Sequence, residues 1–390
     1  MTEEILIIIS ISIIIFISPL VSKFTKIPTV PVEIILGAIA VYFSFIVEHT
    51  ILELVAELGF LYLMFLAGLE VDLKKIINSD PFILKKSLLY NGVLFSLSFL
   101  IAWYFELSNI FVVTLPLISI GMLAALKKEY GDEDWVSMAI LVGLVGEIVS
   151  IIVLTTVSAG LELGFGWEFS KTMMLFFGFL VILLVVYKIF HNLLWWYPEI
   201  KRYLMPDDDH QEQDIRVSMA IFFLLITIMI YLKLEVAFGA FIAGTFIKTF
   251  FEHNKALPTK LEHFGFGWLV PIFFISVGAS FEIDALFHDG LFMKALTIVA
   301  AMIFIRFVAS FLFMKELKGG KFLLIGLSHS MPLTLLIAVT TLAYHSHSIT
   351  QFYYYAFILA SILEVLIVMI VIKLFTYFLF RNNVNQVIVK

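Results

Sequence analysis

The chain has 390 residues, of which 62% are hydrophobic and 14% are charged, with a formal net charge of −6. Soluble domains carry about 25% charged residues, and a water-soluble fold of this length could not bury so much apolar surface, so the composition excludes a soluble globular protein. The small negative charge without a basic patch argues against nucleic acid as a partner, and the absence of cysteine excludes disulfides and thiolate metal sites.

Polar, proline and glycine residues divide the chain into thirteen apolar segments, most of them near the roughly 20 residues that cross a bilayer. They run over 4–22, 30–47, 51–71, 83–105, 109–127, 136–159, 171–190, 214–232, 234–250, 264–285, 290–314, 320–343 and 351–378. The first has acidic residues at its start, where a signal peptide has basic ones, and lacks a small-residue cleavage site, so it is expected to be a retained helix. We therefore expect an all-α membrane protein with about thirteen transmembrane helices.

The lysines and arginines of the loops sort to one side of this topology. With the N-terminus outside and every segment crossing, only Lys171, Lys233 and Lys294 fall on the outer side. The positive-inside rule then predicts a multi-pass protein of the cell (inner) membrane with its C-terminus in the cytoplasm. The polar loop 198–214 is expected to connect two halves on the cytoplasmic side, and its three consecutive aspartates to be solvated.

Four motifs recur in the same order in the two halves. VEIILGAIA (32–40) matches LEVAFGAFIA (234–243), FLAGLEVDL (65–73) matches FISVGASFEIDAL (274–286), LPLISI (115–120) matches MPLTLL (331–336), and VGLVGEIVSIIV (142–153) matches LASILEVLIVMI (359–370). Matching segments are separated by seven crossings, an odd number, so two five-helix repeats should have opposite orientations. Inverted repeats are typical of secondary transporters, whose site lies near the midplane between discontinuous helices.

This pattern predicts one transmembrane transporter domain over residues 1–380. Repeat one covers about 30–160, the cytoplasmic connector about 191–214, and repeat two about 234–378, followed by a short cytoplasmic tail at 381–390.

Helix-breaking residues occupy matched positions in the two halves. Pro116, Ser119 and Gly121 interrupt the fifth segment, and Pro332 and Thr334 interrupt the twelfth. Such interruptions free backbone carbonyls and expose helix ends, which can hold a cation. A simple proline kink in each segment is the alternative interpretation.

Ionisable residues deep in an apolar span are functional candidates. Glu147 in the sixth segment is predicted to bind either a proton or a cation, and a structural hydrogen bond is the alternative. Arg306 could pair with Glu147 or Glu364, stabilise a helix end or reach toward an interface. Glu364 is predicted to act as the partner of Arg306 or of freed backbone amides. Glu57 is a weaker candidate for a second site.

Three stretches resemble the monovalent cation:proton antiporter-2 family. These are ELGFLYLMFLAGLEVDL in the third segment, FGAFIAGTFI in the ninth and WLVPIFFISVGASFEIDAL around the tenth. The resemblance covers the chain to about residue 378 and implies the sodium/proton antiporter fold. It implies a core domain in which the fifth and twelfth segments cross and unwind, a dimerisation domain that makes a homodimer, and an elevator-like motion of the core. It implies no cofactor.

The resemblance also assigns site residues. The family's ion-site pair, Asp-Asp or Asn-Asp, falls on Gly146-Glu147, so Glu147 carries over as the essential carboxylate and the first acid is absent. The conserved basic residue of the eleventh helix falls on Arg306, and Ser119 matches a hydroxyl beside the crossing. Members with one acid tend to be electroneutral, which implies one-for-one exchange of Na+ or K+ for H+. The potassium-efflux branch usually carries a nucleotide-binding domain that this sequence lacks, so Na+ is favoured.

Two other classes of protein stay open. One is an ion-coupled symporter of an organic anion, in which Arg306 would bind the substrate carboxylate. The other is a non-transporting sensor homologue. An enzyme is not expected, because the sequence contains no HExxH or GxSxG motif, and no metal is expected beyond the transported cation.

Overall fold

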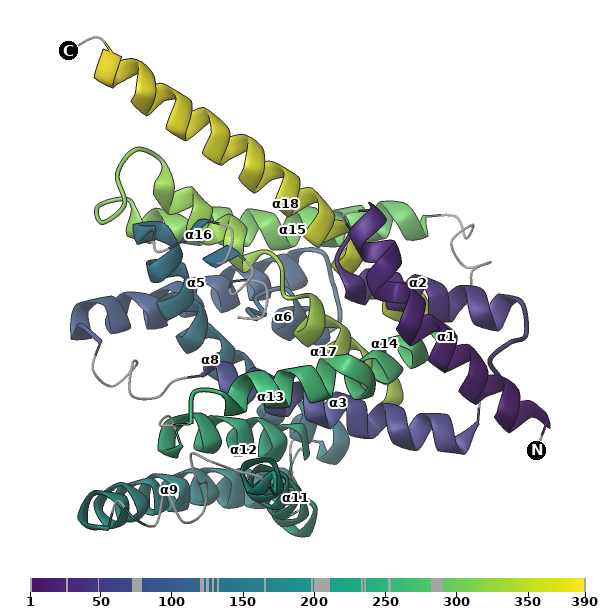
Figure 1. Cartoon of the computed structure of the whole chain (residues 1–390). Coiled ribbons are helices and arrows are strands. Elements are labelled where there is room, and N and C mark those ends of the chain that lie inside the picture. Colours follow the sequence, from purple (N-terminus) through teal and green to yellow (C-terminus); the bar gives the residue numbers. More distant parts are fainter. Residues whose placement is uncertain are drawn as a thin grey trace. The chain divides into compact units, whose positions relative to one another are not determined.

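The computed structural model contains only helices in the part of the chain that it describes (Figure 1), which confirms the predicted all-α class. It describes residues 2–388 apart from 26, 48, 72–78, 120–122, 124–125, 128–129, 132, 165, 198, 200–210, 233, 235, 252–253 and 282–289. Within these residues, 10 helices are long and apolar enough to cross a membrane, and two shorter apolar helices, Thr29–Tyr42 and Val236–Phe250, match the second and ninth predicted segments. The fifth predicted segment, 109–127, begins with the short helix α6 (Ile110–Thr114) and is described only in part. The middle of the predicted connector, 200–210, lies outside the described residues.

The chain divides into two compact units, each built from two stretches of sequence. The first unit comprises Met1–Lys74 and Thr155–Asp284. Its elements are α1 (Thr2–Thr25), α2 (Thr29–Tyr42), α3 (Thr50–Glu70), α9 (Trp167–Trp196), α11 (Gln213–Leu232), α12 (Val236–Phe250), α13 (Leu257–Phe264), the π-helical turn η1 (Gly265–Leu269) and α14 (Val270–Ala279). The tenth predicted segment therefore begins at Leu257, earlier than its apolar stretch indicated, and contains a π turn.

Two helix pairs of the first unit approach backbone to backbone at glycines. A Cβ added at Gly37 of α2 would collide with the carbonyl of Ile275, and one at Gly278 of α14 with the carbonyl of Ile34. Small residues that let helix backbones touch are typical of membrane helix packing. The pair α2 and α14 joins the first helix of repeat one to the second helix of repeat two.

The second pair, α3 and α12, joins the complementary helices of the two repeats. A Cβ at Gly68 would collide with the carbonyl of Phe241, and one at Gly244 with the carbonyl of Phe65. In each pair the first helix of one repeat packs against the second helix of the other repeat, so the two pairs are equivalent, as expected for repeats of the same origin.

Replacing Gly68 by valine is expected to destabilise the first unit, because the added side chain meets the α12 backbone, which cannot move aside as a side chain could. Overpacking typically costs about 1–3 kcal/mol, which should appear as a lower thermal midpoint in detergent. Gly178→Val is the matched control, since no atom beyond its neighbouring residues and the backbone of its own helix lies within 4 Å of a Cβ built there. Equal midpoints for the two variants would contradict this packing.

The second unit comprises Lys75–Leu154 and Ala285–Lys390. Its elements are α5 (Pro81–Tyr104), α6 (Ile110–Thr114), most of α8 (Asp134–Leu163), α15 (Leu291–Ser310), the 3-10 turn η3 (Phe311–Phe313), α16 (Lys321–His329), α17 (Leu333–His345) and α18 (Gln351–Ile388). It thus takes three predicted segments from each repeat. α18 continues to Ile388, so the predicted tail 381–390 is largely a continuation of this helix.

Local sequence explains where these helices begin and end. The Asp80 side chain accepts a hydrogen bond of 2.9 Å from the Phe82 amide, and Pro81 occupies the first turn of α5, the arrangement preferred at a helix start. α16 ends at His329 and α17 begins at Leu333, because Pro332 has no amide hydrogen to continue the ladder. α6 ends at Thr114, and the backbone through Ser119 is not helical. Both predicted interruptions are therefore present.

Candidate functional site

The two interrupted segments meet in the second unit. The Ser119 hydroxyl oxygen lies 3.4 Å from that of Thr334, and α6 packs against α17. Ser119 follows Pro116 in the non-helical stretch, and Thr334 follows Pro332 at the start of α17. The crossing therefore brings one hydroxyl from each repeat together beside backbone that has left its helix. Gly121 lies outside the described residues.

Arg306 of α15 is fully buried and binds this unwound backbone. Its Nη1 donates to the Met302 carbonyl at 2.8 Å, and its Nη2 donates to the Leu117 carbonyl in the non-helical stretch of the fifth segment. The guanidinium thus satisfies an acceptor that the interruption frees and places a positive charge at the crossing. In this structure the Arg306 side chain lies inside the unit and does not extend toward a membrane interface.

Glu147 lies in α8 with only 1% of its surface exposed. One helical turn before Glu147 and one turn after it, residues of α8 pack against the interrupted segments. The Ser150 hydroxyl accepts a hydrogen bond of 3.4 Å from the Ile118 amide, and a Cβ at Gly143 would lie 2.7 Å from Leu123 Cδ1 and 3.5 Å from His329 Nε2. The predicted carboxylate is therefore carried by a helix turn that faces the crossing.

The position that a side chain on Gly146 would take is bordered by two side chains. A Cβ built there would lie 2.6 Å from the Ile118 Cδ1 atom and 3.1 Å from the Asn91 Oδ1 atom. Contacts below 3 Å require a neighbour to move, and the Ile118 side chain is itself fully buried. A side chain at position 146 would therefore first have to displace the terminal methyl of Ile118.

Glu364 of α18 lies in the same unit and is 1% exposed. Neither of its carboxylate oxygens has a hydrogen-bond partner among the residues that the structure describes. Its charge interacts with that of Arg306, without a direct hydrogen bond between the two side chains. Arg306, one of the partners predicted for Glu364, therefore interacts with it through charge alone. The hydrogen bonds of Arg306 go to backbone carbonyls.

The sequence matches, over residues 11–376, the model of the family described as sodium/hydrogen exchanger, transmembrane. The chain belongs to this family. The resemblance drawn from the motifs is thereby confirmed, and with it the expected fold class. The family and the 10 candidate spans together show a multi-pass membrane protein.

Three relatives of this exchanger-family chain have names that describe Na+/H+ antiporters. YjbQ of Bacillus subtilis strain 168 is 26% identical over 386 residues, which cover 90% of this chain and 60% of the relative. Antiporter 3 of Methanocaldococcus jannaschii is 28% identical, covering 78% of each chain, and the Enterococcus hirae antiporter is 25% identical, covering 84% of this chain and 85% of its own. The chain thus spans 60% of the Bacillus protein's length.

The sequence analysis missed Tyr90 of α5, whose hydroxyl forms a buried hydrogen bond within the second unit of this exchanger-family chain. The Tyr90 hydroxyl lies 3.1 Å from His329 Nδ1, and His329 Nε2 lies 2.8 Å from the Ala139 carbonyl. Since a carbonyl can only accept, Nε2 carries the hydrogen and Nδ1 accepts from Tyr90. This chain of hydrogen bonds ties the end of α16 to α5 and α8. The adjacent Tyr90 and Asn91, polar residues in the middle of an apolar span, were the available signal.

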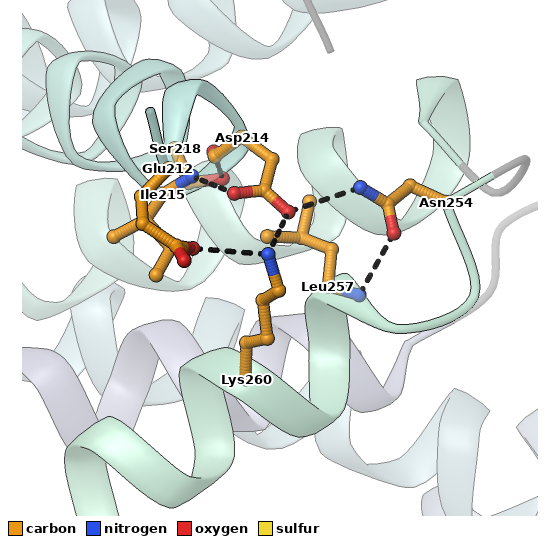
Figure 2. A network of polar contacts seen from close by, with 7 residues as sticks. All are labelled: Glu212, Asp214, Ile215, Ser218, Asn254, Leu257 and Lys260. Carbon is orange, nitrogen blue, oxygen red and sulfur yellow. Dashed lines mark hydrogen bonds and ion pairs between the residues drawn. The ribbon is translucent and has the colours of Figure 1, made fainter. Parts of the chain in front are cut away.

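A second polar cluster lies in the first unit and is a closed network (Figure 2). Lys260 Nζ donates to Asp214 Oδ2 at 3.1 Å and to Glu212 Oε2 at 3.0 Å, and Asn254 Nδ2 donates to the same Asp214 oxygen at 3.1 Å. The Asn254 Oδ1 atom accepts from the Leu257 amide at 3.1 Å. Lys260 supplies the positive charge that balances the two carboxylates, so the cluster needs no bound cation. Its hydrogen bonds join the start of α11 to the start of α13. Glu57, the weaker second-site candidate, is exposed on α3.

Proposed function

We propose that the protein exchanges a monovalent cation, Na+ rather than K+, for H+, with Glu147 as the single carboxylate that holds either ion. The observation that carries the proposal is the buried Glu147 on a helix packed against the crossing of two interrupted segments. The names of the three relatives support Na+ as the cation.

The physical basis is the cost of an uncompensated charge in hydrocarbon. An ionised carboxylate deep in the membrane is costly, so the site crosses between its two states only when a proton or a cation neutralises it. One carboxylate cannot hold both ions strongly, and each therefore displaces the other. The Ser119 and Thr334 hydroxyls and the carbonyls of the unwound stretch are oxygen ligands of the kind that hold Na+ in transporters with broken helices.

Arg306 supports a one-for-one stoichiometry. Its hydrogen bonds run to the Met302 and Leu117 carbonyls, so the guanidinium does not have to leave a carboxylate before an ion can bind. With a single carboxylate in use, one H+ exchanges for one cation and no net charge crosses.

An electroneutral exchanger is expected to give Na+-driven proton flux without electrical current. In proteoliposomes, a pH gradient should dissipate on adding Na+, while the same vesicles on a solid-supported membrane should give no transport current after a Na+ jump. An electrogenic exchanger would couple to the membrane potential by about 2.3 kcal/mol per charge per 100 mV and give a current. No proton flux with either Na+ or K+ would remove the antiporter proposal.

The membrane setting is proposed on the sequence pattern. The distribution of lysine and arginine supports the cell (inner) membrane with the N-terminus outside and the C-terminus in the cytoplasm, and the family resemblance supports a homodimer. An organic-anion symporter that binds its substrate through Arg306 would lose its flux in Arg306→Ala and keep it in Glu147→Gln. The commitment of the Arg306 guanidinium to backbone carbonyls speaks against its binding a substrate carboxylate.

A further inference from the structure

We propose that the carboxamide oxygen of Asn91 is a further ligand of the transported cation, supplied by α5 to the space beside Gly146. The inference rests on the proposed function and deepens it. It names a residue of the ion site that neither the motifs nor the family resemblance pointed to.

The first observation is that the Asn91 side chain is buried with one half unused. Only 2% of its surface is exposed. Its Nδ2 donates to the Ser87 carbonyl one turn earlier at 2.8 Å, which identifies the other atom as the oxygen and holds it away from that carbonyl. This oxygen has no hydrogen-bond partner within the described part of the chain. Because buried polar atoms are nearly always partnered, such an acceptor requires an explanation.

The second observation is where the oxygen lies. It is 3.1 Å from the position of a Cβ on Gly146, one residue before Glu147, and the same position is 2.6 Å from the side chain of Ile118 in the unwound stretch. The neighbours of Ile118 in that stretch are Leu117, whose carbonyl binds Arg306, and Ser119, whose hydroxyl lies against Thr334. An unused oxygen from α5 therefore lies between the backbone of α8 and the unwound segment.

The chemistry of an amide oxygen matches this position. It is a hard oxygen donor without charge, of the kind that binds alkali and alkaline-earth cations. An amide does not take up a proton in the physiological pH range, so Asn91 can strengthen cation binding without adding a second proton site. Asn91 would thus supply from α5 an oxygen ligand that Gly146, which has no side chain, cannot supply. Glu147 would remain the one carboxylate that binds and releases a proton.

The test separates cation affinity from proton affinity. When both ions compete for Glu147, the KM for Na+ rises at acid pH, and the pH at which it begins to rise reports proton binding alone. In proteoliposomes, Asn91→Leu is expected to raise the KM for Na+ at alkaline pH about tenfold, the effect of losing one ligand worth about 1.4 kcal/mol, and to leave that pH unchanged. Asn91→Asp, which keeps an oxygen at the same place, should recover Na+ affinity relative to Asn91→Leu.

Ser96→Ala is the matched control, because Ser96 is an exposed residue of the same helix whose hydroxyl bonds to the Gly92 carbonyl. Asn91→Ala is measured beside Asn91→Leu, so that a folding failure of one variant leaves the comparison intact. A KM for Na+ within twofold of the unaltered protein would overturn the proposal. So would a joint shift of the KM and the proton midpoint, which a general distortion of the Glu147 site produces. Failure of the proposed function looks different: the unaltered protein itself would show no cation-dependent proton flux.

Discussion

Glu147→Gln is expected to abolish cation-driven proton exchange, lowering the rate by at least about 100-fold, equivalent to about 2.7 kcal/mol. A glutamine has nearly the shape of a protonated glutamate but can neither release a proton nor neutralise a cation. The site would therefore remain in a state that resembles the protonated one, whichever ion is supplied. The rate is measured in proteoliposomes as the Na+-dependent dissipation of a pH gradient.

Two further variants locate the effect in the Glu147 charge. Glu57→Gln removes an exposed carboxylate of α3 and should exchange ions at the unaltered rate. Glu147→Asp keeps the charge but draws it back by one methylene, so partial activity with a raised KM for Na+ is expected. Unimpaired exchange in Glu147→Gln would refute the mechanism.

Arg306→Ala is expected to stop exchange and to destabilise the second unit by about 1–3 kcal/mol, the typical cost of leaving a buried hydrogen-bonding group without its partner. The substitution frees the Leu117 carbonyl in the unwound stretch and leaves Glu364 as a buried carboxylate without a counter-charge. Thermal unfolding in detergent and the proteoliposome flux measure the two effects.

The charge argument predicts a rescue. Arg306→Ala combined with Glu364→Gln should unfold at a higher temperature than Arg306→Ala alone, since the uncompensated carboxylate is gone. Arg216→Ala is the control, because Arg216 is exposed on α11. If Glu364→Gln gives no rescue, the two charges are not coupled. Arg306→Lys should be intermediate, because lysine retains the charge but cannot reach both carbonyls in the fixed fork geometry of arginine.

The span pattern was predictable because a bilayer imposes it locally. Every backbone polar group in hydrocarbon must be paired within its own helix, so apolar length and punctuation alone marked the segments. The interruptions at Pro116 and Pro332 were predictable because helix-breaking residues occupy matched positions in the two halves, whereas a lone proline such as Pro19 lies within a continuous helix. The extension of α18 to Ile388 and the start of α13 at Leu257 were missed, since polar residues continue a helix beyond its apolar stretch without any hydropathy signal.

The site was predictable as a set of residues, but only in part as a set of contacts. A charge at position 147, 306 or 364 inside an apolar span is visible in the sequence. That Arg306 donates to the Leu117 carbonyl instead of to either glutamate is not, because the two residues are 189 positions apart and meet only when α15 packs against the unwound stretch. Asn91 and Tyr90 are visible in the sequence as adjacent polar residues within an apolar span, but that the Asn91 oxygen lies unpartnered beside Gly146 depends on the packing of the helices.

The sequence by itself predicted the apolar segments along the chain, the recurrence of motifs in its two halves, and the charges that lie within those segments. Each of these follows from the cost of exposing a polar group to hydrocarbon, a cost that is incurred residue by residue. Only the tertiary structure decided that Gly146 abuts Ile118 and Asn91 and that Ser119 meets Thr334. Those contacts depend on the rotation and close approach of helices far apart in the chain, and a change of one residue in helix register would replace every one of them.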